Sequence, residues 1–386
     1  MNFGFTEEQD FLRESVRKLV EERCPMPEVR RLMTTPDAYS PELWSEMAAL
    51  GWLGLLVPEE HGGAGLGWVD LVVLLEETGR GLLPSPLLSN ALATTALLRA
   101  GSRDQRRRWL PGLADGSTIG TLALLEAEDV QGPSGIGLEA SVEGEDHLLS
   151  GSKHFVADVG CADLFVVAYR EPSGREPSGR GAEERPGETL RLALVPADRA
   201  GVCVERIPSL DETKRTGTLR LEGVRIAPEE RLEAMPAADS IELLQDCGSI
   251  AVTAEALGAA EGALALTVQY AKDRVQFGSP IGRFQGVKHR LSDMWVDTES
   301  IKSLLYYGAW SIEGSPEELP RYASLAKAYI ADAFTRIGVD CVQLHGAVGY
   351  TIEYDIQLYL KRSKWVRPLF GDADHHRDRL ATRRGL

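Results

Sequence analysis

Residues 274–289 read RVQFGSPIGRFQGVKH. The segment separates two long stretches with helical hydrophobic spacing: its Gly-Ser-Pro-Ile-Gly centre ends the first helix, and a Phe-Gln pair begins the second. Arg274 is predicted at the C-terminus of the first helix, where the helix dipole favours a cation. The same guanidinium is suited to bidentate binding of a pyrophosphate. Two interpretations of Arg274 fit these residues equally well. It either caps the helix beside a Phe277 that packs in the core, or it binds an anion.

Two other glycine-rich segments raise the same question. QLHGAVGYTIEYDIQLYLKR (343–362) ends a helix at Gly346 and Gly349. Backbone amides of the glycine-containing loop at such an end are able to bind a ligand, and a plain glycine cap explains the same residues equally well. HGGAGLG (61–67), by contrast, lacks both the GxGxxG spacing and the strand-to-helix context of a nucleotide loop. It is predicted to be a tight loop between helices.

The hydrophobic pattern divides the chain into three parts. Residues 1–115 show helical spacing, and Thr6-Glu7-Glu8-Gln9 fits a capping box. Residues 116–230 alternate short strand-like runs with turns, which is typical of an antiparallel sandwich or barrel. Residues 231–386 return to long helices joined by short turns, as in a four-helix bundle. The predicted fold class is therefore α+β, without the βαβ alternation of a Rossmann sheet.

One predicted loop interrupts the middle part. Residues 170–179 are a tandem REPSG-REPSG, followed by RGAEERPGE. The segment is polar, rich in Pro and Gly, and lies between two predicted strands. We therefore expect an expanded, mobile hairpin loop.

Composition excludes several classes of function. The chain has 386 residues, 43% of them hydrophobic, enough for two or three packed units. A formal net charge of −16 disfavours nucleic-acid and anionic-membrane partners. Scattered cysteines without CxxC spacing argue against a zinc site or a disulfide framework and indicate a reducing cytoplasm. The acidic N-terminus is not a signal peptide, and no apolar run is expected to span a bilayer.

Four ordered segments together resemble the acyl-CoA dehydrogenase family. They are PEEHGGAGLG (58–67), LSGSKHFVADVGCADLFVV (149–167), RVQFGSPIGRFQGVKHRLSDM (274–294) and QLHGAVGYTIEY (343–354). The resemblance covers essentially the whole chain and implies the same helix–β–helix order. It also implies FAD as the cofactor, held partly across a subunit interface.

The resemblance assigns cofactor contacts residue by residue. Arg274, Gln276 and Phe277 are expected at the phosphates and the adenine side, and Phe284 and Gln285 near the ribose and adenine. The remaining contacts to the dinucleotide are expected from a neighbouring subunit, through Gln343, His345, Gly346 and Gly349. The helix break would then present a cation, amide groups and an aromatic face to one extended anionic ligand.

The flavin-ring side departs from the family pattern. The family's Thr-Glu-Pro-x-Ala-Gly-Ser-Asp segment corresponds to LLEAEDVQGPSG (124–135), where only Glu126 is retained. Its Trp-Ile-Thr corresponds to Phe155-Val156-Ala157. Phe155 is able to stack on the ring, but Ala157 has no hydroxyl to donate.

The catalytic base is also missing from its usual places. Proton abstraction next to a thioester carbonyl needs a carboxylate within reach, which most members carry in a Tyr-Glu-Gly-Thr segment. The corresponding LFGD (369–372) puts Phe370 or Gly371 there, and the position used by a minority of members falls at Gly248. Asp372 and Asp246 are the nearest carboxylates. Asp372 is the candidate base, with a helix N-cap as the alternative role.

No metal site is expected, because the adjacent His375 and His376 face different ways on a helix. Two functions stay open. One is an FAD-dependent dehydrogenase that converts an acyl-CoA or acyl-carrier thioester to the enoyl thioester and passes electrons to an electron-transfer flavoprotein. The other is a non-catalytic partner subunit of a heterotetrameric dehydrogenase that contributes part of the FAD site. Both predict a homo- or heterotetramer acting in lipid metabolism.

Overall fold

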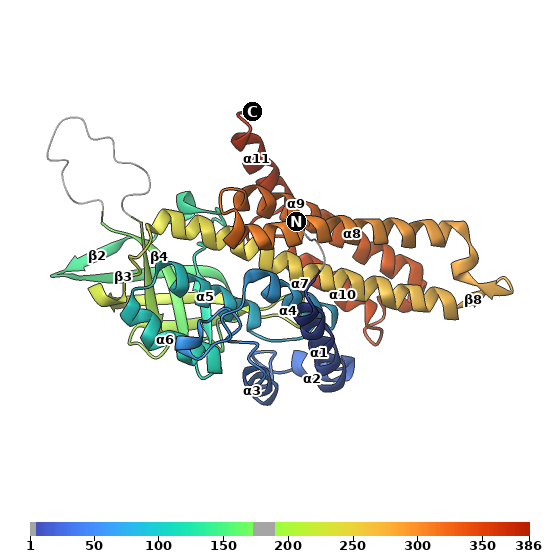
Figure 1. The fold of residues 1–386 in the computed structure, drawn as a ribbon, viewed down its shortest axis with the longest axis horizontal. Coiled ribbons are helices and arrows are strands. Elements are labelled where there is room, and N and C mark those ends of the chain that lie inside the picture. Colours follow the sequence, from blue (N-terminus) through green and yellow to red (C-terminus); the bar gives the residue numbers. More distant parts are fainter. Residues whose placement is uncertain (1–4, 173–189) are drawn as a thin grey trace.

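The structure is a computed structural model that describes residues 5–172 and 190–386. The first part of the chain is helical, as predicted (Figure 1). Thr6 caps the first helix through the expected capping box with Gln9, and Ser40 caps the third by accepting a hydrogen bond from the Leu43 amide. The helices are α1 (Glu7–Arg23), α2 (Met26–Met33), α3 (Pro41–Ala49), α4 (Trp68–Arg80), α5 (Leu87–Ala100) and α6 (Arg103–Asp115).

Two small sheets follow and pack face to face. One has the strand order β1-β4-β5 and the other β2-β3-β7-β6. Apolar side chains from both sheets, such as Phe165 and Leu221, form one shared core, which confirms the predicted sandwich. The strands are β1 (Gly120–Ala123), β2 (Ala140–Glu143), β3 (Asp146–Ala157), β4 (Leu164–Arg170), β5 (Leu190–Pro196), β6 (Val202–Ile207) and β7 (Thr216–Ile226).

One strand pair differs from the purely antiparallel expectation. β1 pairs with β4 in parallel, with Gly120 opposite Leu164. Parallel neighbours need a crossover connection, and the β2–β3 hairpin lies within that connection. β4 and β5 pair antiparallel, as the predicted hairpin requires. The expanded loop predicted between them falls mostly on residues 173–189, which lie outside the described residues.

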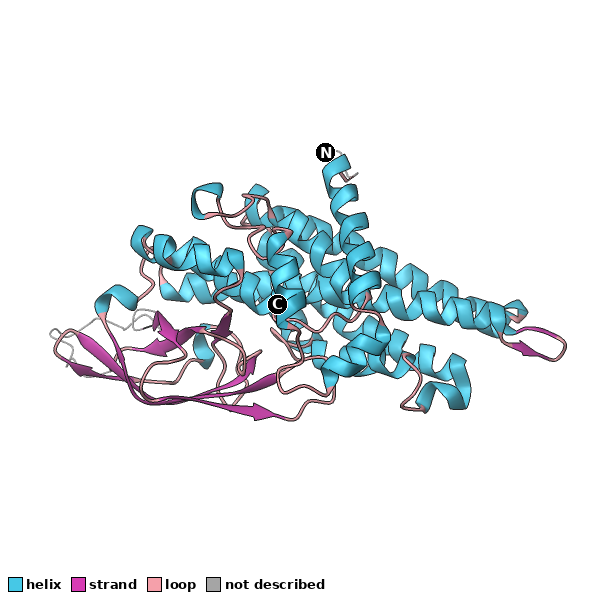
Figure 2. Ribbon diagram, turned by 90° about the horizontal axis from the view of Figure 1, so that it is seen from below, coloured by secondary structure: helices cyan, strands magenta, loops and turns pink. Residues whose placement is uncertain are grey.

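Long helices form the last part of the chain, and Figure 2 shows them extending away from the strands. The elements are α7 (Ala237–Asp273), the hairpin β8 (Val275–Gln276) and β9 (Ser279–Pro280), α8 (Gln285–Gly314), α9 (Leu319–His345), α10 (Ile356–Val366) and α11 (Ala373–Arg383). The secondary structure changes type between α6 and β1 and again between β7 and α7. The predicted domains 1–115, 116–230 and 231–386 have boundaries near those changes. The division itself stays a prediction.

The sequence led us to expect no apolar run long enough to span a bilayer. That expectation is wrong, because one helix has the necessary length and composition. α7 has 37 residues and is apolar enough to cross a membrane, but 83% of its most apolar window is buried inside the protein. The sequence reading missed this because the many alanines of α7 raise the mean hydropathy without forming an obvious leucine-rich run. The helix is the core of the structure.

Helices α4 and α7 touch backbone to backbone. A Cβ added to Gly258 on α7 would overlap the carbonyl oxygen of Glu76 on α4, and one added to Gly79 would overlap the carbonyl oxygen of Glu255. The small residues that the sequence places along α7 therefore allow an approach that larger side chains would block. This contact attaches the N-terminal helices to the C-terminal ones.

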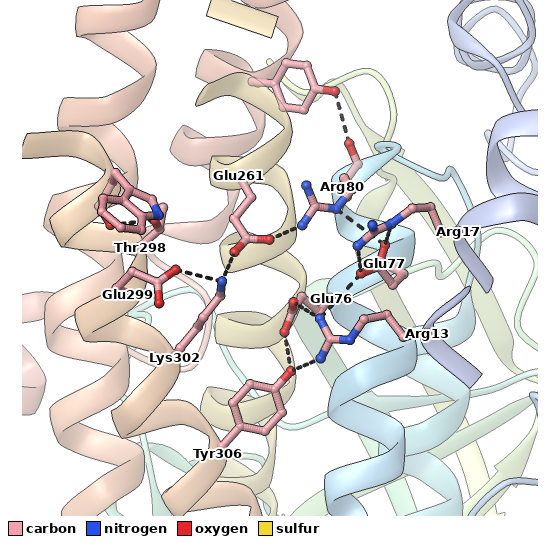
Figure 3. A network of polar contacts seen from close by, with 12 residues as sticks. Arg13, Arg17, Glu76, Glu77, Arg80, Glu261, Thr298, Glu299, Lys302 and Tyr306 are labelled. Atoms are coloured by element: carbon pink, nitrogen blue, oxygen red, sulfur yellow. Dashed lines mark hydrogen bonds and ion pairs between the residues drawn. The ribbon is translucent and has the colours of Figure 1, made fainter. Parts of the chain in front are cut away.

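A buried ion network reinforces the same junction (Figure 3). Glu76 and Glu77 on α4 are fully buried and pair with arginines of α1: Arg13 Nη1 lies 2.7 Å from Glu76 Oε1, and Arg17 Nη2 lies 2.7 Å from Glu77 Oε1. The Tyr306 hydroxyl on α8 donates to Glu76 and accepts from Arg13. Because each buried carboxylate has a cationic partner, the junction tolerates the charges that it buries.

We predict that Gly258→Ala lowers the free energy of unfolding of the full chain by about 1–3 kcal/mol, because the new methyl group would meet backbone that cannot rotate away. Gly286→Ala on α8 is the matched control, since a Cβ there has no atom within 4 Å. Urea denaturation at one protein concentration measures both. Equal stabilities for the two variants would contradict the proposed close contact.

Candidate active site

A pocket lies where the β sandwich meets the helices. It is bounded by α5, by the end of β3, by the first turns of α7 and by the turn before α11. None of the described residues that line it is an aspartate or a glutamate. The lining residues are Leu88, Ser89, Leu92, Thr121, Leu122, Leu124, Leu125, Gln131, Gly132, Ile136, His154, Phe155, Ala157, Ile241, Gln245, Trp365, Leu369 and Phe370.

Phe155, the expected flavin-ring contact, lies in this pocket. Its side chain is 43% exposed and its φ is 56°, a conformation that is rare for a bulky residue. Phe370 in the same pocket has a φ of 55°. Strained backbone persists where the surroundings hold it, and it concentrates at functional sites. The two aromatic rings are therefore held in the pocket at a conformational cost.

Gly248 and Phe370, the positions that correspond to the catalytic glutamate in the family resemblance, face each other. A Cβ added to Gly248 on α7 would lie 2.6 Å from Cδ1 of the Phe370 ring. The ring therefore fills the space that a side chain at position 248 would need. Neither position carries a carboxylate, and the contact joins residues far apart in the sequence.

Asp372, the candidate base, does not line the pocket. Its Oδ1 accepts hydrogen bonds from the amides of Asp374 at 3.1 Å and His375 at 2.9 Å, so it is the N-cap of α11. These backbone donors lower the pKa of Asp372 below its ordinary value. The geometry matches the alternative role that the sequence allowed, and a low pKa weakens a carboxylate as a base.

The other carboxylates near these positions also have structural partners. Asp246 is buried and forms an ion pair with Arg379. Glu126 Oε1 lies 2.7 Å from Nζ of the buried Lys153 and accepts the amide of Leu138 at 2.9 Å. Burial by itself raises the pKa of Glu126. Hydrogen bonds from Lys153 and from backbone amides outweigh that effect, so the pKa lies below its ordinary value. Glu126 thus ties its loop to β3.

The pocket also contains polar residues that the sequence reading missed. His154 Nε2 lies 3.0 Å from Ser152 Oγ, and Gln245 Nε2 lies 3.1 Å from His375 Nε2. Gln245 was detectable, because Ile241, Gln245 and Gly248 follow the i, i+4, i+7 spacing of one helix face. His154 gave no such signal, since adjacent residues on a regular strand point to opposite faces. The irregular register of β3 between Lys153 and Val156, which the sequence does not reveal, lies where both His154 and Phe155 line the pocket.

Five expected dinucleotide residues gather around the β8–β9 hairpin and the start of α8. Their side chains are exposed, and Phe277 at the hairpin is 94% exposed with a φ of 53°. Within residues 5–172 and 190–386, Arg274 has no acidic partner. The residues are Arg274, Gln276, Phe277, Phe284 and Gln285.

The second expected group lies at the end of α9. Gln343 and Gly346 are exposed, whereas His345 and Gly349 are buried. His345 stacks on Tyr270 of α7 with ring centroids 4.3 Å apart, so the end of α9 lies beside the end of α7. The structure therefore brings both expected dinucleotide groups to the same end of the helices.

His345 supplies a test of whether these residues fit a cofactor. Its Nδ1 lies 2.7 Å from the Cys341 carbonyl oxygen and must donate, which leaves Nε2 as an acceptor when the ring is neutral. Burial lowers the pKa of His345, and among the residues that the structure describes its buried Nε2 has no hydrogen-bond partner. A ligand hydroxyl or amino group would satisfy that atom. An unpaired arginine, an exposed aromatic ring and an orphan acceptor fit the phosphates, base and ribose of a dinucleotide.

The pocket and the dinucleotide residues lie at opposite ends of α7. Gln245 is near the start of the helix and Arg274 follows its last residue; the 37-residue helix is about 55 Å long. Figure 1 shows β8 at the far end of the molecule from the sheets. The expected dinucleotide contacts and Phe155, the expected flavin-ring contact, are therefore far apart within one chain.

Comparison with known proteins agrees with this architecture. The acyl-CoA dehydrogenase N-terminal domain profile matches residues 6–117, and the C-terminal domain profile matches residues 246–384. Acyl-CoA dehydrogenase IpdE2 of Mycolicibacterium smegmatis is 31% identical over 95% of both chains.

Two solved structures are similar over nearly their whole length. A single-residue variant of the Tcur3481-Tcur3483 steroid ACAD has 31% identity and a TM-score of 0.86, with 97% of each chain covered. The ChsE4-ChsE5 complex from Mycobacterium tuberculosis has 27% identity and a TM-score of 0.88, with 100% of this chain and 99% of that chain covered. The two family profiles and the similarity to IpdE2 and to the steroid ACAD place the chain among flavoprotein oxidoreductases. The chain belongs to the acyl-CoA dehydrogenase family, whose members bind FAD.

The contact between Gly248 and Phe370 generates a test by double-mutant cycle. We predict that Gly248→Ala lowers the free energy of unfolding by about 1–3 kcal/mol, because the methyl group would overlap the ring. In a Phe370→Ala background the same change should cost less than about 0.5 kcal/mol. Denaturant unfolding of the four proteins measures the coupling. Additive effects would contradict the contact.

A second prediction concerns Asp158, which is buried behind the pocket and accepts a hydrogen bond from Ser89 Oγ at 2.6 Å. Burial raises the pKa of Asp158 to about 6, although Lys214 opposes the shift. Since the folded chain holds this proton more tightly than the unfolded chain, stability falls as pH rises through the folded pKa.

Asp158→Asn should therefore be more stable than the wild type at pH 8, by about 3 kcal/mol, and the gain should vanish below about pH 4. Asparagine is able to accept the Ser89 hydroxyl and tolerates the φ of 53° at this position. Urea unfolding at the two pH values measures the difference. A gain of the same size at both pH values would contradict the pKa shift.

Proposed function

We propose that the chain is one subunit of a heteromeric FAD-dependent dehydrogenase of acyl thioesters, and that a related subunit supplies the catalytic base. The observation that carries this proposal is the Phe370 ring packed on Gly248, because it places an aromatic side chain where a carboxylate would act. The chain would then be one of the divergent members that lack the usual glutamate. ChsE4-ChsE5, with 27% identity to this chain, is itself a complex, which supports a heteromeric assembly.

The residues of this chain would take two roles in such an enzyme. At the hairpin end, Arg274 would neutralise the pyrophosphate, Phe277 and Phe284 would pack on the adenine side, and His345 Nε2 would accept a hydrogen bond. The bound FAD supplies hydride acceptance. At the pocket end, Phe155 and the apolar lining would orient the acyl group and exclude water from it.

A homomeric dehydrogenase is the second candidate. Asp372 is two residues from Phe370, and the intervening Gly371 has a φ of 95°. If the turn rearranged, the Asp372 carboxylate would have to give up two amide hydrogen bonds before it could reach the pocket. The cost of that loss favours the heteromeric proposal. In both cases the thioester is on CoA or a carrier protein, and an electron-transfer flavoprotein is the proposed acceptor.

The test is to purify the chain alone and together with a related subunit encoded nearby, and to record the visible flavin spectrum and its bleaching by an acyl thioester. We expect well below one FAD per chain for the chain alone, and both FAD and bleaching for the complex. Asp372→Asn should retain the bleaching rate of the complex within about twofold, like the control Asp374→Asn on the same helix, because the proposal gives Asp372 no proton-transfer role.

Two results would overturn the proposal in favour of the homomeric enzyme. One is a chain that, purified alone, carries one FAD per chain and is bleached by the thioester. The other is a loss of about 10²–10⁴-fold in Asp372→Asn without a matching loss in Asp374→Asn, which is the size expected for removal of a general base.

A further inference from the structure

The turn formed by residues 367–372, which carries Phe370 into the pocket, is held from behind by buried side chains. Nζ of Lys327 on α9 donates to the carbonyl oxygens of Arg367 at 2.9 Å and Gly371 at 2.7 Å. His376 Nε2 lies 2.9 Å from the Phe370 carbonyl oxygen and must donate, because that oxygen has no hydrogen. Three carbonyl groups of one short turn are thus bound by α9 and α11.

Lys327 is an unusual residue to find in this position. Its side chain is fully buried, and within the described residues it forms hydrogen bonds to backbone carbonyls and no ion pair. Burial lowers the pKa of Lys327 to about 7, while Asp372 and Asp332 favour its charged form and Arg367 opposes it. A buried amine without a carboxylate partner is costly unless its hydrogen bonds are well made.

The conformation of the turn explains what the hydrogen bonds achieve. The Gly371 amide donates to the Pro368 carbonyl oxygen at 3.1 Å, which closes a four-residue turn. Phe370 is the third residue of that turn and has a φ of 55°, where turns ordinarily require glycine. A strained phenylalanine stays in such a position only if its neighbours hold it there.

We propose that Lys327 is a positioning residue that fixes the 367–372 turn and thereby keeps the Phe370 ring in the pocket against Gly248. Lys327 does not line the pocket, so it acts on the pocket through the turn. The inference goes beyond the proposed function, because it holds whether this chain or a related subunit supplies the base.

Hydrogen–deuterium exchange on the full chain tests the proposal without flavin or substrate. In Lys327→Met, which keeps the length and apolar stem but removes the donor, the amides of Gly371, Asp374 and His375 should exchange at least about tenfold faster. The matched control is Lys153→Met, because Lys153 is also fully buried and bonds to Glu126 and to the Leu124 carbonyl oxygen, away from the turn. It should leave the exchange of those amides unchanged.

The variant Phe370→Gly distinguishes the stability of the turn from the presence of the aromatic ring that the turn carries. Glycine relieves the strained φ, so the turn amides should stay protected although the pocket has lost its aromatic wall. Lys327→Met should increase the exchange of the turn amides less in a Phe370→Gly background than in the wild type. Without the strained phenylalanine, the turn depends less on the hydrogen bonds from Lys327.

Two outcomes would overturn the proposal. In the first, folded Lys327→Met keeps the wild-type exchange of the turn amides. In the second, exchange rises equally along α7 and in the turn, and Lys153→Met does the same, which would make Lys327 a general contributor to stability. Midpoints of thermal unfolding for the two methionine variants, measured in parallel, separate local loosening from global destabilisation.

Discussion

The backbone contact between α4 and α7 is the constraint on which the rest of the structure depends. Gly79 and Gly258 remove the side chains that would keep the two helices apart, and the acidic residues beside the contact are buried as a result. Those charges are then paired on both sides: Glu76 with Arg13, and Glu255 with Arg362, whose Nη1 lies 2.6 Å from Glu255 Oε1. The close approach buries these carboxylates, and removing the cationic partner of one would leave an uncompensated buried charge.

Once α7 is fixed in this way, it sets the distance between the two functional ends of the molecule. Its N-terminal part carries Gln245 into the pocket and Gly248 against the Phe370 ring, and its last turn carries Tyr270 to His345 and leads into the exposed hairpin. That distance follows from helix length and cannot be shortened by a side-chain movement. An interface between chains is therefore part of the proposed function and not an addition to it.

The turn before α11 presents an aromatic ring to the pocket. The turn before α11 is anchored by Lys327 and His376 and capped by Asp372, so its backbone is well defined, yet the residue it carries inward is a phenylalanine. Glu126 and Asp246 likewise have structural partners. The hydrogen bonds and ion pairs of Asp372, Glu126 and Asp246 direct these three carboxylates to structural tasks. This arrangement supports a subunit that shapes a site completed by a second chain.

Sequence alone determined the features that depend on neighbours along the chain. Caps at Thr6 and Ser40 and the order of helical and strand segments follow from local hydrogen bonds, periodicity and residue type. The dinucleotide contacts around Arg274 come from the family resemblance and stay a prediction. Tertiary structure alone decided that β1 runs parallel to β4, that Phe370 fills the space at Gly248, and that Lys327 holds the turn. These are contacts between residues distant in sequence, and which of them form depends on how whole elements pack, a choice that no local pattern encodes.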